Sequence, residues 1–281
     1  MLSYLHSYHA GNFADVVKHV TLVGLLQAIL RKDTPCYVHD SHAGRGLYHF
    51  SSRESLQGRE FENGIGRLWQ VQQAPELIQQ YLALVQRYNT KPGELLHYPG
   101  SPAIAQAMLR QTDRLLLTEL HPMEYERLVK QFSPDRRIRI DQQDAYQGLK
   151  AFLPPAERRG LVLIDPAYER KDEYEHVITG LIQAHKRWAN GIYVIWYPVM
   201  SRALQARFIE ACKAADIPKM LHAEFMTKAF SYSLDFVGCG VVIVNPPWKL
   251  DKTLEENLDW LLPVLQQGPG ARTRVQWIVP E

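Results

Sequence analysis

The sequence predicts an α/β fold in which helices cover both faces of a mostly parallel, seven-stranded sheet. Two observations support this prediction: short apolar runs ending in a polar or acidic residue recur along the chain, and segments with helical periodicity separate them. Strand–helix–strand units close through right-handed crossovers, so the strands run parallel. The seven runs are residues 36–40, 115–119, 138–141, 161–165, 192–196, 220–225 and 240–245.

The composition is that of a globular protein without a strong preference for polyanions. Of its 281 residues, 46% are hydrophobic and 22% charged, which excludes disordered and fibrous classes. Lys and Arg number 32 against 30 Asp and Glu, a net charge of +2. Any contact with nucleic acid would therefore have to be local.

Cysteine usage and the first residues predict a cytoplasmic protein. Cys36, Cys212 and Cys239 lie far apart, and an odd count without paired spacing argues against disulfides and a cysteine zinc site. The chain does not start with basic residues followed by an apolar stretch, and no segment approaches the roughly 20 apolar residues of a membrane span. We expect neither secretion nor membrane insertion.

The first helix is expected over residues 14–31, where apolar residues recur at helical spacing and Asn12 or Asp15 could cap the start. The alternation of strands and helices then breaks, because about 70 residues separate the first two predicted strands. We predict that residues 48–100 form a helical insertion subdomain at the ligand-binding edge of the sheet. Residues 1–47 and 101–281 would form the main domain.

Ligands of an open parallel sheet bind beyond the carboxyl ends of the strands, where the strand order reverses. The first predicted strand is followed there by a glycine turn, in which Gly44 and Gly46 allow the backbone to approach a cofactor closely. The turn lacks the third glycine and the immediate strand–turn–helix–strand unit of a dinucleotide site. A nicotinamide dehydrogenase is therefore disfavoured.

The next two predicted strands bring acidic residues to the same edge. Glu119 ends one strand and can accept hydrogen bonds from both hydroxyls of a ribose, and Asp144 follows the other, placed to accept from an adenine amine. This pattern suits a nucleoside-bearing cofactor without a pyrophosphate, such as S-adenosylmethionine. Either acid could instead be a solvated strand end or a helix cap.

The fourth predicted strand ends in Asp165-Pro166-Ala167-Tyr168, which resembles the Asp/Asn-Pro-Pro-aromatic signature of methyltransferases acting on amino nitrogens of nucleobases. Such a nitrogen is a poor nucleophile because its lone pair is delocalised into the ring. The Asp165 carboxylate and the Pro166 carbonyl can accept its hydrogens and return electron density to it. Tyr168 can stack on an extruded base. Ala167 replaces the usual second proline, which leaves the turn less rigid but keeps the first carbonyl.

The same signature recurs at residues 245–248, Asn-Pro-Pro-Trp. The seventh strand of this class of methyltransferase runs antiparallel to the others, which would place Asn245 at the opposite edge from the cofactor. We therefore predict that Asp165 is the chemical residue and that residues 245–248 form a turn ending a strand.

Polar side chains crowd the N-terminal stretch, among them Tyr4, His6, Lys18 and His19. A zinc site built from His6, His9 and His19 lacks the paired spacing of such sites, so no metal is expected. We expect this stretch to fold over the active site, with Lys18 and His19 contacting the cofactor carboxylate and Tyr4 and His6 reaching the substrate. A solvated tail is the alternative.

Further candidates flank the insertion and the catalytic turn. His42 and Ser101 would share the cofactor pocket. Arg170 and Lys171 follow the turn and are the basic pair expected to contact phosphate, whereas the other basic clusters are expected on a solvated surface.

With these residues in place, the sequence resembles the bacterial 23S ribosomal RNA large-subunit methyltransferase J family over essentially its whole length. The likeness is dispersed over many short and specific segments. They are residues 1–4 (Met-Leu-Ser-Tyr), 9–12 (His-Ala-Gly-Asn), 14–16, 18–19, 42–44 (His-Ala-Gly), 98–102 (Tyr-Pro-Gly-Ser-Pro), 118–122 (Thr-Glu-Leu-His-Pro), 196–198 (Trp-Tyr-Pro), 245–249 and 277–281.

The resemblance implies a monomeric, Rossmann-like enzyme that uses S-adenosylmethionine to methylate N6 of one adenine of 23S rRNA, adenine 2030. It places the catalytic acid on Asp165. The implied cofactor contacts are Lys18 or His19, His42, Ser101, Glu119, Asp144 and Ala145. Ala145 and Ala167 depart from residues that relatives can carry, but neither departure removes a functional side chain.

Two alternatives remain at this point. The four-residue signature is specific for the amine and not for the sugar, so an N6-adenine methyltransferase acting on DNA is one. A non-catalytic nucleic-acid-binding protein is the other, and Ala167 is its only support in the sequence.

Overall fold

A computed structural model describes residues 4–91, 93–170, 172–230 and 235–280. Its main sheet has eight strands, one more than the seven predicted. In their order across the sheet they are β10 (Arg272–Val279), β8 (Met220–Met226), β9 (Gly238–Val244), β7 (Ile192–Val199), β6 (Gly160–Ile164), β1 (Tyr37–Asp40), β4 (Arg114–Thr118) and β5 (Ile138–Asp141). All seven predicted strands are present, and β10 is the one that the sequence analysis missed.

The sheet is mostly parallel, as predicted. β1 pairs in parallel with β4 and β6, and the parallel pairing continues from β4 to β5 and from β6 to β7. β9 is antiparallel to both β7 and β8, and β10 is antiparallel to β8. After β5 the chain returns to the other side of β1, so the strand order reverses between β1 and β6. Ligand sites of such sheets lie at this reversal.

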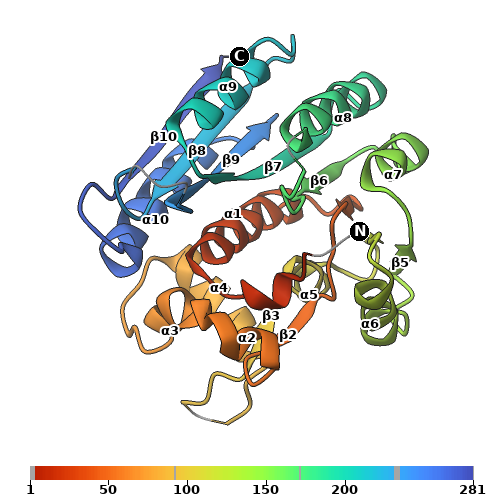
Figure 1. Ribbon diagram of the computed structural model, residues 1–281. Coiled ribbons are helices and arrows are strands. Elements are labelled where there is room, and N and C mark those ends of the chain that lie inside the picture. The colour runs from red at the N-terminus through yellow and green to blue at the C-terminus, as the bar shows by residue number, and fades with distance from the viewer. Residues whose placement is uncertain (1–3, 92, 171, 231–234, 281) are drawn as a thin grey trace.

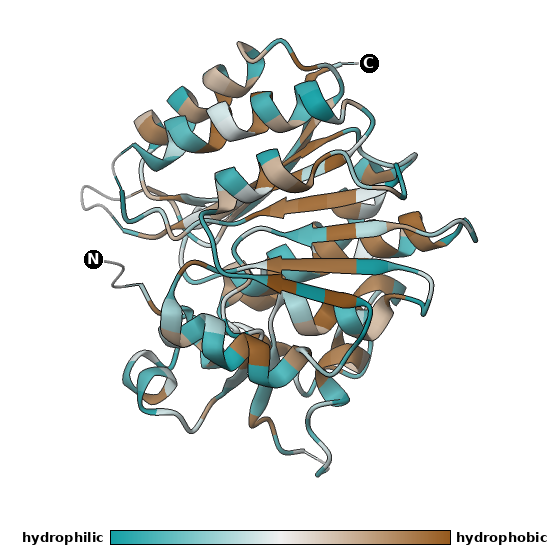
Figure 2. Ribbon diagram, turned by 90° about the vertical axis from the view of Figure 1, so that its right-hand side faces the viewer, coloured by the Kyte–Doolittle hydropathy of each residue, from teal (hydrophilic) through white to brown (hydrophobic). Residues whose placement is uncertain are grey.

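Helices cover both faces of the sheet (Figure 1, Figure 2), each over its own buried apolar cluster. One cluster includes residues of α1 (Phe13–Leu30), α5 (Ser101–Met108), α6 (Pro122–Phe132) and α10 (Leu250–Leu265). The other includes residues of α7 (Ala145–Phe152), α8 (Glu173–Arg187) and α9 (Arg202–Lys213). Figure 2 shows the apolar strands between these two layers.

Helix α1 begins where the sequence predicted. The Asn12 side chain caps it by accepting hydrogen bonds from the backbone N–H groups of Ala14 and Asp15. α1 is long and apolar enough to cross a bilayer by length and composition, contrary to the expectation that no segment approaches this. The helix lies inside the fold, with 83% of its residues 13–30 buried, because it packs against α4, α5 and α10.

The chain between β1 and α5 forms short helices and a small hairpin. The elements are β2 (Leu47–His49), α2 (Arg53–Gly58), the 3-10 helix Glu60–Asn63, α3 (Ile65–Leu68), α4 (Glu76–Gln86) and β3 (His97–Pro99). β2 and β3 pair antiparallel, with Leu47 opposite Pro99, so the two ends of this stretch meet. Several of its side chains, such as Tyr81 and Val85, join the cluster around α1. The division into residues 48–100 and the remainder as separate units stays a prediction.

Candidate active site

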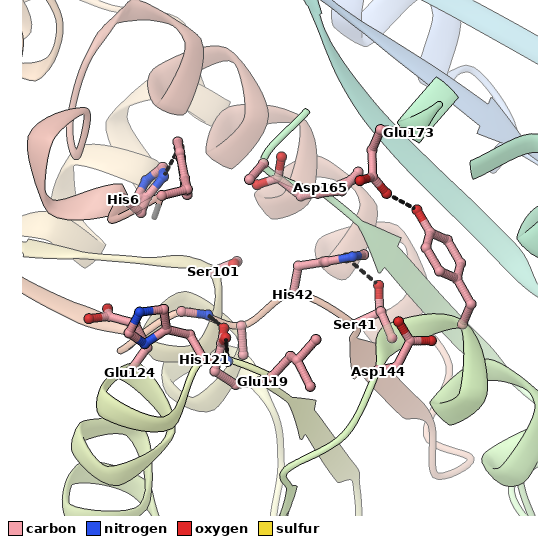
Figure 3. Close-up of a pocket in the computed structure, with 18 of the residues that line it drawn as sticks. His6, Ser41, His42, Ser101, Glu119, His121, Glu124, Asp144, Asp165 and Glu173 are labelled. Atoms are coloured by element: carbon pink, nitrogen blue, oxygen red, sulfur yellow. Dashed lines mark hydrogen bonds between the residues drawn. The ribbon is translucent and has the colours of Figure 1, made fainter. Parts of the chain in front are cut away.

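A cavity of about 530 Å³ opens at the carboxyl ends of the strands, at the reversal between β1 and β6. Figure 3 shows its side chains converging from several elements. The predicted site residues that line it are Tyr4, His6, Lys18, His19, His42, Gly44, Ser101, Glu119, Asp144, Ala145, Asp165 and Pro166. Residues as far apart in sequence as Tyr4 and Pro166 thus share one cavity, because each follows a strand end or belongs to a segment packed against that edge.

The glycine turn and the end of β4 hold each other in place. Glu119 accepts a hydrogen bond from the Gly44 backbone N–H at 2.7 Å and another from the His121 N–H at 2.7 Å. Gly44 has a φ of +59°, and a Cβ there would lie 2.5 Å from the Tyr48 hydroxyl, so a larger residue would be strained. The carboxylate of Glu119 is therefore oriented by backbone groups at the cavity wall. Burial raises its pKa despite these two hydrogen bonds.

The end of β1 carries a buried carboxyl group behind the cavity wall. Asp40 is 2% exposed, and burial raises its pKa to about 6, with nearby Asp165 adding to the shift and Ser101 opposing it. His42 follows on the turn, its Nδ1 2.9 Å from the Ser41 hydroxyl. Burial lowers the pKa of His42 to about 4, so the ring at the cavity is neutral near pH 7.

Asp144 and the start of α7 form the next wall. The Asp144 carboxylate caps α7 by accepting from the Gln147 N–H, which is the helix-cap alternative left open by the sequence. Tyr146 lines the same wall, and its hydroxyl donates to Glu173 Oε1 at 2.7 Å. The His42 ring meets Tyr146 edge-on, with centroids 6.0 Å apart. This contact joins the α7 wall to the glycine turn.

A buried charge cluster lies opposite, around Lys18 of α1. The Lys18 ammonium is 2.5 Å from Asp165 Oδ2 and 2.8 Å from Asp15 Oδ1. His6 Nε2 is 2.9 Å from Asp15 Oδ2, and the Tyr4 hydroxyl is 2.9 Å from His6 Nδ1. Burial alone would lower the pKa of Lys18, but the two carboxylates raise it well above its usual value. The cluster thus keeps a cation beside the carboxylate that follows β6.

His19, the next residue of α1, is oriented by tyrosines. Its Nδ1 is 2.8 Å from the Tyr98 hydroxyl, which in turn is 2.9 Å from the Tyr81 hydroxyl. His19 Nε2 is buried and has no hydrogen-bond partner in the described part of the chain. The other two histidines considered as zinc ligands have acidic partners: His6 contacts Asp15 and His9 contacts Glu60.

The turn after β6 divides its residues between the cavity and the layer behind it. Asp165, Pro166 and Ala167 line the cavity, whereas Tyr168 is not among the lining residues. The Tyr168 backbone is left-handed, with a φ of +53°, and its hydroxyl donates to the Trp196 carbonyl at 2.7 Å. Its ring packs against Tyr174 and Trp196.

Asn245 lies far from this cavity, as the antiparallel direction of β9 requires. Its side-chain amide donates to the carbonyls of Ala189 and Gly191, which precede β7 at the other edge of the sheet. Neither Asn245 nor Trp248 lines the cavity. Residues 245–248 follow the end of β9, and Trp248 is 86% exposed.

Several lining residues were missed by the sequence analysis. They are Ser41, Ala43, Tyr48, Gly100, Leu120, His121, Glu124, Gln143, Tyr146, Gln147, Lys150, Glu169, Glu173 and His176. Ser41, His121 and Tyr146 directly adjoin or nearly adjoin predicted residues, so proximity in sequence could have found them. Glu173 and His176 lie on α8 and carry no such signal. Arg170 lines the cavity as expected of a substrate-facing residue, and Lys171 lies outside the described residues.

The strand order, the reversal at β1 and β6, and a cavity rich in strand-end acids define a Rossmann-like methyltransferase fold. Residues 33–279 match the family model described as ribosomal RNA large subunit methyltransferase D, RlmJ. The chain therefore belongs to this family of ribosomal RNA large-subunit methyltransferases.

Two relatives match the chain over its full length. Ribosomal RNA large subunit methyltransferase J of Escherichia coli K12 is 42% identical over 281 residues, covering all of both chains. The protein of the same name from Haemophilus influenzae Rd is 43% identical over 282 residues, again covering all of both. The crystal structure of protein LPL1258 from Legionella pneumophila has a TM-score of 0.88 at 34% identity and covers 96% of this chain and 98% of that one.

Proposed function

We propose that this protein transfers a methyl group from S-adenosylmethionine to N6 of one adenine of 23S rRNA, adenine 2030. The observation that carries the proposal is the position of Asp165 and Pro166. They follow β6 at the strand reversal and line the same cavity as Glu119 and Asp144. The full-length likeness to two large-subunit rRNA methyltransferases supports rRNA as the substrate.

The cavity suits the cofactor in size and in chemistry. About 530 Å³ lies within the range of small-molecule sites. Glu119, held by two backbone N–H groups, would accept the ribose hydroxyls, with Gly44 beside it, and Asp144 and Ala145 would contact the adenine. The Nε2 of His19 is buried and has no hydrogen-bond partner among the described residues, so it is a group that a ligand would be expected to satisfy. When bound, the cofactor supplies an activated methyl group on a sulfonium.

The remaining cofactor contacts would come from the charge cluster and the glycine turn. Lys18, kept cationic beside Asp15 and Asp165, would bind the cofactor carboxylate together with His19. His42 and Ser101 would line the rest of this pocket.

Asp165 and Pro166 would act on the amine. The carboxylate and the Pro166 carbonyl would each accept one amine hydrogen, which turns the nitrogen toward tetrahedral geometry and restores its lone pair. The target base would have to leave its stack to reach them. Lys18 pairs with Oδ2 of Asp165 at 2.5 Å, so the amine would bind the other carboxylate oxygen, Oδ1, while this ion pair is kept.

Tyr4, His6 and Tyr168 would contact the substrate. Tyr4 and His6 line the cavity on the side of Lys18 and are hydrogen-bonded to each other. Tyr168 does not line the cavity, so its ring would have to move from its contacts with Tyr174 and Trp196 toward the cavity to stack on the base. The enzyme is proposed to work as a cytoplasmic monomer on 23S rRNA, free or in an assembly intermediate, without a membrane partner.

Methyl transfer from radiolabelled S-adenosylmethionine tests the proposal. Purified protein is mixed with unmodified 23S rRNA, with assembled large subunits or with duplex DNA. We expect label in rRNA, at N6 of a single adenine. Label only in DNA would replace the rRNA assignment, and no label in any substrate would favour a binding protein.

The two copies of the four-residue signature give a matched pair of variants. Asp165→Ala should lower transfer by about two to three orders of magnitude while binding of S-adenosylhomocysteine is largely kept. Asn245→Ala should leave transfer unchanged, because that side chain does not line the cavity and its amide donates to backbone carbonyls at the opposite end of the strands. The reverse result would move the chemistry to Asn245.

A further inference from the structure

Three buried side chains connect the cavity to the stretch between β2 and β3. They are His19 on α1, Tyr98 on β3 and Tyr81 on α4, with exposed fractions of 1%, 0% and 0%. His19 lines the cavity, whereas the two tyrosines do not. The hydrogen bonds described above join them in the order His19, Tyr98, Tyr81.

Burial decides the direction of these hydrogen bonds. Each tyrosine hydroxyl has one proton, and Tyr98 is the partner found for the Tyr81 hydroxyl within the described residues. If His19 donated from Nδ1, Tyr98 would donate to Tyr81, and the Tyr81 proton would be buried without an acceptor. If Tyr81 donates to Tyr98 and Tyr98 donates to His19, every hydroxyl proton is paired. The second arrangement is favoured because an unpaired buried donor is costly.

We infer that Tyr98 is a positioning residue that fixes His19 as its Nε2–H tautomer and reserves that N–H for the bound cofactor. Burial lowers the pKa of His19 to about 3, so the neutral ring has one N–H to give near pH 7. Nδ1 accepts from Tyr98, which leaves the proton on Nε2, the nitrogen without a partner.

A neutral N–H at this position suits an acceptor oxygen of the ligand. Lys18, the preceding residue, is cationic. Two of its three N–H groups meet Asp15 and Asp165, which leaves the third for an oxygen of the ligand. The carboxylate of the cofactor would accept from both the His19 Nε2–H and the Lys18 ammonium. This choice of ligand rests on the proposed function. In the other tautomer an Nε2 lone pair would face this carboxylate and repel it. Tyr98, by selecting the tautomer of His19, would therefore raise the affinity for the cofactor without touching the cofactor itself.

The tautomer can be measured without any ligand. We expect nitrogen-15 NMR of histidine-labelled protein to show His19 with a protonated Nε2 and an unprotonated Nδ1, and a His19→Gln variant identifies the signals. Tyr98→Phe should shift them toward values averaged between the two tautomers. Tyr81→Phe is the matched control, since it removes a buried hydroxyl from the same series of hydrogen bonds but leaves Tyr98 donating to His19. The His19 signals of this variant should therefore match those of the unmodified protein. A protonated Nδ1 in the unmodified protein would overturn the inference.

Binding of S-adenosylhomocysteine, measured by calorimetry, tests the consequence for the cofactor. Tyr98→Phe should weaken binding about fivefold, the typical effect of one hydrogen bond, and Tyr81→Phe less than about twofold. Equal affinities in Tyr98→Phe and the unmodified protein would refute the positioning role. If the unmodified protein shows the expected tautomer but binds no S-adenosylhomocysteine, the proposed function and the ligand named here fail, while control of the tautomer by Tyr98 stands.

Discussion

Gly180 makes room for the wall of the cavity. A Cβ at this position of α8 would lie 2.5 Å from the Tyr146 ring. The hydroxyl of Tyr146 donates to Glu173, at the start of the same helix. Real Cβ atoms do not come this close to a ring, so a side chain at residue 180 would push Tyr146 out of place. A residue outside the cavity thereby sets the position of a residue that lines it.

Gly180→Ala should displace Tyr146 and weaken the binding of S-adenosylhomocysteine. The overpacking should also cost about 1–3 kcal/mol of stability, offset in part by the better helix propensity of alanine. Gly148→Ala in α7 is the control, because its Cβ would meet its nearest neighbour, Thr118, at 3.4 Å. Thermal unfolding and calorimetry would compare the two variants. If both behaved alike, Gly180 would not be required for the position of Tyr146.

Asp40 makes the stability of the protein depend on pH. Burial raises its folded-state pKa to about 6, above the value of about 3.9 in an unfolded chain. A raised carboxyl pKa favours the folded state below the unfolded value, and this contribution is lost as the pH rises through about 6. Asp40→Asn should therefore raise the melting temperature, relative to the unmodified protein, more at pH about 8 than at pH about 5. An equal difference at the two pH values would contradict this assignment.

At the scale of elements, the start of α1 combines a helix cap with a tertiary contact. Asn12 accepts from the first N–H groups of α1, while its amide donates to Glu60 at 2.9 Å. Glu60 also pairs with His9. The beginning of the helix is thus tied to the stretch between β2 and β3.

Removal of this cap should destabilise the protein. Asn12→Ala loses the cap and the Glu60 contact, and we expect it to lower the free energy of unfolding by about 1–2 kcal/mol. Asn12→Ser keeps a capping oxygen but loses the contact with Glu60, so it should cost less. Urea denaturation would measure both. A larger loss for serine than for alanine would show that capping is not what Asn12 contributes.

The seven strands predicted from the sequence are all found. Six of them are mostly buried, whereas β5, at one edge of the sheet, is partly exposed. β10, at the other edge, was missed because the exposed residues Arg272 and Arg274 alternate with Thr273 and Val275, so no continuous apolar run marks it. Three-residue strands such as β2 and β3 carry too little pattern to be predicted. The reversed direction of β9, which separates Asn245 from the cavity, is confirmed, although it followed from the class of enzyme and not from residue patterns.

The candidate site was predictable to the extent that its residues follow strand ends. Asp165 and Glu119 belong to this group. Tyr146 and Glu173 could not be predicted as a pair, because their hydrogen bond depends on the packing of α7 against α8. The same holds for Tyr98 and Tyr81, whose contact with His19 depends on how the stretch between β2 and β3 folds back onto α1.

At the scale of the whole molecule, the net charge of +2 limits how RNA can be bound. A nearly neutral protein has little long-range attraction for a polyanion, so phosphate contacts must come from a few side chains near the cavity. Arg170 is such a side chain, since it lines the cavity and is largely exposed.

Arg170→Gln should weaken binding of a 23S rRNA fragment and reduce the slope of log affinity against log salt by about 1. Arg207→Gln is the control. Arg170 pairs with Asp172, and Arg207 is likewise exposed and paired with an acid, Glu175, but it does not line the cavity. Binding measured over a range of salt concentrations would separate the two. Equal slopes for both variants would place the RNA elsewhere.

The pairing of β2 with β3 also bears on how the length of this chain can vary. Leu47 lies opposite Pro99, and the Gly100 N–H donates to the Gly46 carbonyl at 2.9 Å. The segment between them, more than fifty residues long, therefore begins and ends at the same place in the fold. The entropy of closing such a loop changes only with the logarithm of its length. Residues could be added or lost at its outer turns without displacing Gly44 or Ser101, provided that the side chains covering α1 remain. The hairpin thus allows this segment to change in length while the geometry of the cavity stays fixed.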